Sequence, residues 1–202
     1  MELPSNSLWN AFIEGYQFHT CDGECVTTRI VDAGTLILPT GRIVVTDPFL
    51  DPFSKPFTVR VPPGAYPVML SLIKEDVALV LVSFSEGNPV LWLETKPDCF
   101  SVDSAHGCLM DHKIARFLRK QAKHNKYDKY YHRFEDALAE NSGISGNYCF
   151  DSVSGANIIL FHTWGGDGTY PSFFGYNAEN KLVCLVTDMF LGIEQVLDVH
   201  DA

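Results

Sequence analysis

The hydrophobic period of the chain changes twice, and these changes constrain the fold more than any other feature. Residues 27–103 follow the pattern of β-strands, residues 111–140 follow that of helices, and residues 147–190 return to strands. Because the strands are grouped instead of alternating with helices, the pattern predicts an α+β fold. We expect a mainly antiparallel sheet, twisted or barrel-like, with a two-helix insertion at 111–140.

Helix signals support this division of the chain. Asp111 precedes "HKIARFLRKQAKHN", where Ile114 and Phe117 begin an apolar face, so Asp111 is a predicted N-cap. Ser and Asn residues before "LWNAFIEGY" predict a short N-terminal helix at 5–15. A chain of 202 residues with 46% apolar and 20% charged residues can bury a core, and we expect a single domain.

Three segments carry specific strand and turn signals. "LILPTGRIVV" (36–45) predicts a hairpin, because Gly41 can supply the positive φ of a tight turn. "VALVLVSF" (77–84) is apolar throughout and predicts a central strand that is covered on both faces. "HTWGGDGTYPSFFGY" (162–176) is interpreted as a glycine-rich turn of a β-hairpin, because it matches no phosphate-binding motif.

The charge of the chain bears on its partners. A formal net charge of −10 argues against binding to a nucleic-acid backbone and suits a basic protein partner, although it also serves solubility. One basic cluster, interleaved with tyrosines, is interpreted as a solvated helix face. It consists of Lys113, Arg116, Arg119, Lys120, Lys123, Lys126 and Lys129.

Six cysteines raise the question of disulfides and zinc. The N-terminus lacks the pattern of a secretory signal and no apolar run could span a membrane, so we expect a cytoplasmic protein with reduced thiols. Cys21 and Cys25, beside His19, have a spacing that could bind zinc, but no second close pair follows. We expect no cofactor, and whether the two cysteines bind a metal stays open.

Aspartates stand at predicted strand ends, and three interpretations remain open for them. They could hold turns together, form a divalent-metal or acid–base cluster, or bind a ligand without chemistry. The metal candidates are Asp103, Asp111 and Asp167. The wider set also contains Asp47 and Asp188.

Nucleophile and binding candidates come from two short segments. In "DSAHGCLMD", His106 could share a strand face with Cys108 or with Ser104, and Asp103 or Asp111 could orient the imidazole. The glycine loop supplies the binding candidates, because aromatic residues are enriched in binding patches. These are Trp164, Asp167, Tyr170 and Phe174.

Four segments in a fixed order resemble the bacterial domain-of-unknown-function family 4241. They are "LPTGRIVVTDPF", "VPPGAYPVMLS", "VDSAHGCLMD" and "GGDGTYPSFFGYNAENKLVCLVTD", and they extend from about Leu36 to Phe190. Ser104-Ala105-His106 and Met189 depart from the family pattern. The resemblance implies the importance of these segments but no activity. Members of such families sometimes lie beside toxin genes as antidotes.

Three functional hypotheses follow, of which the simplest is a structural accessory domain with no small-molecule site; the other two are more specific. The first is a soluble binding or interaction module with an acidic surface, such as an antidote that engages a basic toxin. The alternative is a divalent-metal-dependent hydrolase that uses Asp103, His106, Asp111 and Asp167.

Overall fold

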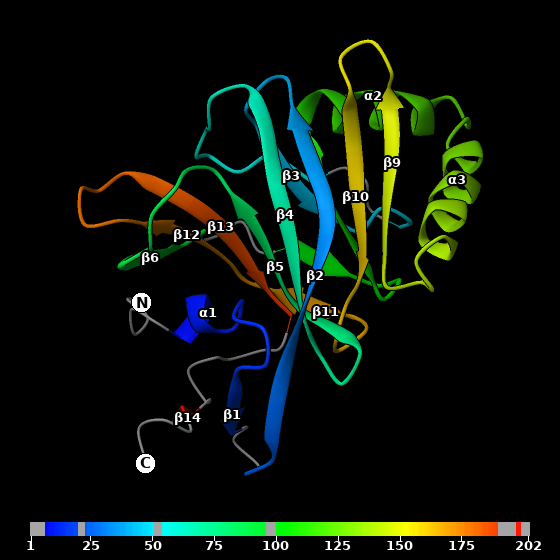
Figure 1. Ribbon diagram of the computed structural model, residues 1–202. Helices are drawn as coiled ribbons and strands as arrows, with labels where there is room; N and C mark the ends of the chain where they lie inside the picture. Colours follow the sequence, from blue (N-terminus) through cyan, green and yellow to red (C-terminus); the bar gives the residue numbers. More distant parts are fainter. Residues whose placement is uncertain (1–6, 20–22, 51–53, 96–99, 190–196, 199–202) are drawn as a thin grey trace.

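The computed structural model describes residues 7–19, 23–50, 54–95, 100–189 and 197–198 (Figure 1). The fold is α+β, as predicted, and its strands pair antiparallel in three sheets. The largest sheet curls strongly into a half-barrel and has the order β14-β1-β2-β4-β5-β13-β12-β6. Its strands are β1 (Gln17–His19), β2 (Cys25–Leu38), β4 (Gly64–Ile73), β5 (Asp76–Ser83), β6 (Leu91–Glu94), β12 (Ser172–Tyr176), β13 (Leu182–Asp188) and β14 (Leu197–Asp198).

A second sheet has four strands in the order β3-β8-β10-β9. It comprises β3 (Ile43–Thr46), β8 (His106–Asp111), β9 (Ser145–Asp151) and β10 (Ala156–His162). Along β8, Leu109 packs into the core shared with the large sheet, whereas Cys108 and Met110 face a core shared with two helices. Successive side chains of a strand point to opposite faces of its sheet, which explains this alternation. Because both of its faces are covered, this sheet is the middle layer of the molecule.

The two helices of the insertion form the outer layer and pack on the middle sheet (Figure 1). They are α2 (His112–Lys123) and α3 (Asp128–Ala139), which confirms the insertion at 111–140. Asp111 is the N-cap of α2, and its carboxylate accepts a hydrogen bond from Lys113 N at 2.7 Å. Ile114 and Leu118 bury the apolar face of α2 against the middle sheet.

The apolar strand predicted at 77–84 corresponds to β5. It pairs with β4 on one side and β13 on the other, and its six central residues are buried. The prediction of a central strand is therefore confirmed.

Two predicted hairpins are wrong, because strands that are adjacent in sequence join different sheets. β2 belongs to the large sheet, whereas β3 pairs with β8 in the middle sheet. Gly41 does make the turn between them, with φ +64°, and it lies against the carbonyl of Val61. The connection at 162–176 likewise leaves β10 for a separate ribbon, in which β11 (Gly168–Tyr170) pairs with β7 (Phe100–Val102).

The N-terminal helix is shorter than the predicted 5–15. In the described part it is α1 (Ser7–Asn10), and it continues as turns in which Phe12 N donates to Trp9 O. Thr28 Oγ1 donates to Ile13 O at 2.6 Å, so β2 ties down the chain where a longer helix would continue. The strands predicted at 147–190 exist, but they are divided among the three sheets.

Candidate functional site

Asp47 directly follows β3, and its carboxylate links two loops through hydrogen bonds. Its buried carboxylate accepts hydrogen bonds from Phe49 N at 2.8 Å and Leu50 N at 3.0 Å. It also accepts from Asp103 N at 3.0 Å and Ser104 Oγ at 2.8 Å. A buried carboxylate that accepts several N–H and O–H hydrogen bonds has a structural role, because its removal would leave those buried donors without acceptors.

His106 and His162 form a cross-strand pair next to the loops that Asp47 links. They oppose each other on β8 and β10, with ring centroids 5.3 Å apart and nearly perpendicular. His106 Nδ1 lies 2.6 Å from Ser104 O, and its ring also contacts Phe49. Burial lowers the pKa of His162, the nearby His106 lowers it further, and Asp76 at 3.7 Å opposes the shift. His162 is therefore held neutral at pH 7.

Asp167 joins this group from the glycine loop. Its carboxylate accepts a hydrogen bond at 3.0 Å from the backbone N–H of Ala105, which has φ +55°. The loop is closed internally, because Thr163 Oγ1 and Tyr170 Oη both donate to Gly166 O. We call the residues around these contacts the loop cluster; they are Asp47, Ser104, His106, His162 and Asp167.

Cys108 is unsuited to nucleophilic attack in this structure. Its side chain is fully buried in the core beneath the helices. Burial raises the pKa of the Cys108 thiol well above its usual value, and the charge of Asp47 raises it further. A thiol in such surroundings stays protonated at neutral pH and is inert.

The candidate carboxylates do not all converge. Asp103 and Asp167 join the loop before His106 through backbone N–H groups, Asp103 by its own N–H and Asp167 through that of Ala105. Asp111 lies at the other end of β8, about 16 Å along the strand from His106. Both Asp111 oxygens accept hydrogen bonds from Thr40 or Lys113. Within the described ranges, no three His, Cys, Asp or Glu side chains are placed to share a metal ion.

The four predicted binding residues differ in their accessibility. Tyr170 and Phe174 are only 1% and 2% exposed and belong to the core between the sheets, so a partner at the surface would not contact them. Trp164 is partly buried, and Asp167 is exposed. Of the zinc candidates, Cys25 is exposed, while Cys21 lies outside the described residues.

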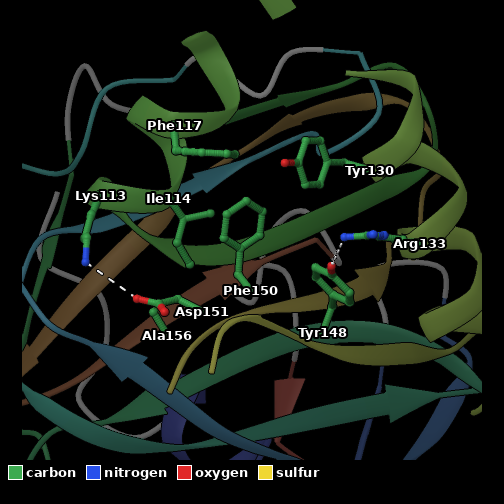
Figure 2. A pocket seen from close by; sticks show the side chains of 9 residues that line it. All are labelled: Lys113, Ile114, Phe117, Tyr130, Arg133, Tyr148, Phe150, Asp151 and Ala156. Carbon is green, nitrogen blue, oxygen red and sulfur yellow. Dashed lines mark hydrogen bonds and ion pairs between the residues drawn. The ribbon is translucent and has the colours of Figure 1, made fainter. Parts of the chain in front are cut away.

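A groove lies between the helices and β9 (Figure 2). Its volume is about 310 Å³, within the size range of small-ligand sites. Phe117 and Tyr130 reach it from the helices, and Tyr148 and Phe150 reach it from β9. We call it the ring groove; it is lined by Lys113, Ile114, Phe117, Tyr130, Arg133, Tyr148, Phe150, Asp151 and Ala156.

Three aromatic rings of the groove pack against one another. Phe117 meets Tyr130 and Phe150 edge-on, with ring centroids 6.0 Å and 5.2 Å away. Tyr130 and Phe150 are stacked at 5.4 Å and 25°. Phe117 nevertheless remains 40% exposed, so an aromatic surface stays open to a ligand.

Charged groups stand at opposite ends of the ring groove (Figure 2). At one end, Lys113 Nζ lies 3.7 Å from an Asp151 carboxylate oxygen. At the other, Arg133 donates to Tyr148 Oη at 2.8 Å. Hydrogen bonds from Ser154 Oγ and Val153 N lower the pKa of Asp151, which keeps this carboxylate ionised at neutral pH.

Sequence reasoning missed this groove, because only part of its lining lies in the segment with the basic and aromatic pattern. Basic residues interleaved with aromatic ones usually indicate a solvated helix face. Phe117 and Tyr130 lie in that segment, but Tyr148 and Phe150 lie in a strand beyond it. Only the packing of α2 and α3 on β9 shows that these rings meet.

The fold and these two regions define an α+β protein in which a helical layer and a glycine loop flank a small antiparallel sheet. A sequence profile described as "Protein of unknown function (DUF4241)" matches residues 36–187, about three quarters of the chain. The chain belongs to this family, which confirms the resemblance seen in its sequence. No curated protein and no solved structure matches it at a significant level. No helix in the described residues is long and apolar enough to cross a membrane.

Proposed function

We propose that the protein is a binding module and that the ring groove holds a planar, negatively charged ligand. The observation that carries this proposal is the cluster of Phe117, Tyr130 and Phe150 around a hollow of about 310 Å³. A hollow of this size, lined by aromatic and aliphatic groups with a few polar groups, is typical of small-molecule sites.

The apolar part of the groove favours a flat ring. Ile114 and Ala156 are only 2% and 1% exposed, so a ligand gains little by covering them and its apolar contacts depend on the exposed rings. Phe117 offers an exposed aromatic face to such a ring. Stacked or edge-on aromatic contacts contribute about 0.5–1.5 kcal/mol beyond the burial of area.

The polar part of the groove favours negative charge on the ligand. Lys113 and Arg133 stand at its two ends, and Lys129 lies 4.8 Å from the Tyr130 ring centroid. Asp151 is the single carboxylate among the lining residues, and Lys113 already offsets part of its charge. Arginine in particular matches planar anionic groups through paired hydrogen bonds.

Thermal-shift measurements with paired aromatic compounds test this proposal. Indole acetate and benzoate, compared with indole and benzene, separate the ring from the charge. At a hundredfold excess over Kd, a binder raises the melting temperature by about 5–10 °C. Phe117→Ala removes that rise, whereas Tyr131→Ala, which changes a 38% exposed ring outside the groove, retains it. Equal rises in both variants would show that the binding occurs elsewhere.

A second candidate function is that of an antidote, in which the acidic, strand-rich part of the protein binds a basic protein partner. Residues 111–140 contain eight of the 15 Lys and Arg residues but five of the 25 Asp and Glu residues, which leaves seven cations against 20 carboxylates elsewhere. Mixing the protein with the product of its neighbouring gene tests this idea. A stable complex would bury about 1,600 Å² and dissociate in high salt, and the absence of a complex at micromolar concentration argues against it.

For both candidates we propose a cytoplasmic protein with reduced thiols. The metal-dependent hydrolase has less support, because Asp111 is distant from His106 along β8 and is engaged as a helix cap.

A further inference from the structure

A second hollow lies on α2 directly beside the ring groove. Its volume is also about 310 Å³. Lys113 and Phe117 line both hollows, so a single row of side chains separates them. We call it the α2 hollow; it is lined by Thr40, His112, Lys113, Arg116, Phe117 and Lys120.

The cations of the α2 hollow share one helical face. Lys113, Arg116 and Lys120 are spaced by three and four residues, which brings their side chains together on a helix. All three are exposed at the surface, and no Asp or Glu lines the hollow. The result is a concentrated positive charge on a protein whose formal net charge is −10.

Helix stability does not account for this placement of cations. Lys113 and Arg116 lie in the first half of α2, whose first turn contains no acidic residue. The helix dipole makes cations unfavourable near an N-terminus. The Asp111 carboxylate at the N-cap offsets part of this repulsion, and a bound anion would offset more of it.

Two further polar nitrogens belong to His112, which lines the hollow, and to its neighbour Arg42. His112 N donates to Arg42 O at 2.9 Å, which places the two residues together. Arg42 Nε and His112 Nδ1 are buried and have no hydrogen-bond partner among the described residues. Burial lowers the pKa of His112, and the charges of Arg42 and Arg116 lower it further, as expected where the local potential is positive.

We propose that the two hollows together bind a mononucleotide, with the base in the ring groove and the phosphate against Lys113, Arg116 and Lys120. This inference rests on the proposed function of the ring groove and specifies its ligand. A base linked to a phosphate through one sugar suits two hollows that share Lys113 and Phe117. A phosphate accepts hydrogen bonds from several cationic groups at once.

The groups around the ring groove orient this ligand. Asp151 lies at the Lys113 end of the ring groove, where it is paired with Lys113 and can accept a hydrogen bond from an amino group on a base edge. Bases with an exocyclic amino group are therefore preferred. The net charge of −10 disfavours a long polyanion, so a mononucleotide fits better than a nucleic-acid strand.

Isothermal titration of the full chain tests the proposal with four probes. These are adenosine 5′-monophosphate, adenosine, inorganic phosphate and a single-stranded oligoadenylate. The monophosphate binds at least about tenfold more tightly than adenosine, because a charge-assisted contact contributes that much. Arg116→Glu and Lys120→Glu remove this difference. Lys123→Glu makes the same charge change on α2 outside both hollows and retains it.

Each other result overturns the inference in a distinguishable way. Equal binding of adenosine and its monophosphate leaves the ring groove as a ligand site but excludes the phosphate contact. Oligoadenylate that binds more tightly, with equal losses in Lys120→Glu and Lys123→Glu, identifies a nucleic-acid surface along α2. If aromatic carboxylates also fail to bind, the proposed function of the ring groove fails as well.

Discussion

Asp47 accepts a hydrogen bond from Ser104 Oγ at 2.8 Å, joining residues that are 57 positions apart in the sequence. Three backbone N–H groups also donate to this carboxylate. The contact fixes the end of β3 against the loop that leads into β8, and so it positions the loop cluster.

Replacing Asp47 should therefore be costly. Asp47→Ala leaves buried donors without an acceptor, and we expect a loss of about 2–4 kcal/mol in the free energy of unfolding. Urea denaturation measures it. Asp103→Ala is the matched control, because the Asp103 side chain is exposed and only its backbone joins the network. Equal losses in the two variants would contradict the anchoring role.

Asp111→Ala should weaken both the start of α2 and its attachment to the turn at Thr40. The loss of an N-cap costs about 1 kcal/mol, and the two contacts to Thr40 add to it. Asp111→Asn retains a capping acceptor and should recover part of the stability. Denaturation followed by far-UV circular dichroism distinguishes them. A stability of Asp111→Ala equal to that of the parent would contradict this assignment.

Gly41→Ala should destabilise the protein more than Gly15→Ala does. Both glycines have positive φ, +64° and +73°, so both substitutions carry the conformational cost of about 1 kcal/mol. At Gly41 an added Cβ would lie 1.9 Å from Val61 O, whereas nothing lies within 4 Å at Gly15. Melting temperatures of the two variants should differ by several degrees. Similar melting temperatures would show that the backbone around Val61 yields easily.

The stability of the protein should fall as the pH falls below 6.5, in part because of His162. The folded-state pKa of His162 lies below its ordinary value of 6.5, mainly through burial. The unfolded state therefore binds a proton first, and the stability present above pH 6.5 is lost as the pH falls through the folded pKa. His162→Gln should lose less stability than the parent between pH 8 and pH 5.5.

A matched control for that experiment is His132→Gln, which changes an exposed histidine on α3. Its stability should follow the parent across the same pH range. If His162→Gln follows the parent as well, burial and the nearby His106 do not hold His162 neutral.

Alkylation should distinguish exposed from buried thiols. Burial raises the pKa of Cys108 well above its usual value and that of Cys184 to about 12, so neither should react in the native protein. Cys25 and Cys149 are exposed and should react with iodoacetamide at neutral pH. Mass spectrometry of native and denatured samples identifies the labelled residues. Labelling of Cys108 in the native sample would contradict its burial and support it again as a candidate nucleophile.

The sequence predicted those parts of the fold that depend on local pattern. The helical period after Asp111, its N-cap and the apolar run of β5 are all visible within short windows. The pairing of strands is not local. Gly41 indicated a turn correctly, but nothing near it shows that β3 pairs with β8, more than 60 residues further along the chain.

The candidate site was predictable to a lesser degree. Strand-end aspartates pointed to Asp47 and Asp167, and the structure gives both a part in one loop cluster. The ring groove could not be predicted, because Phe117 and Phe150 meet only when α2 packs on β9. A solvated helix and a ligand-binding helix have the same sequence pattern until such a neighbour is known.

The segregation of charge gives the molecule a large electric dipole moment. The helical layer lies at one side of the fold and has a net excess of cations, while the remainder is strongly acidic (Figure 1). An approaching anion is repelled by most of the surface and guided to the positive side, so its encounters are oriented before contact. Association rates at α2 should consequently fall steeply as ionic strength increases.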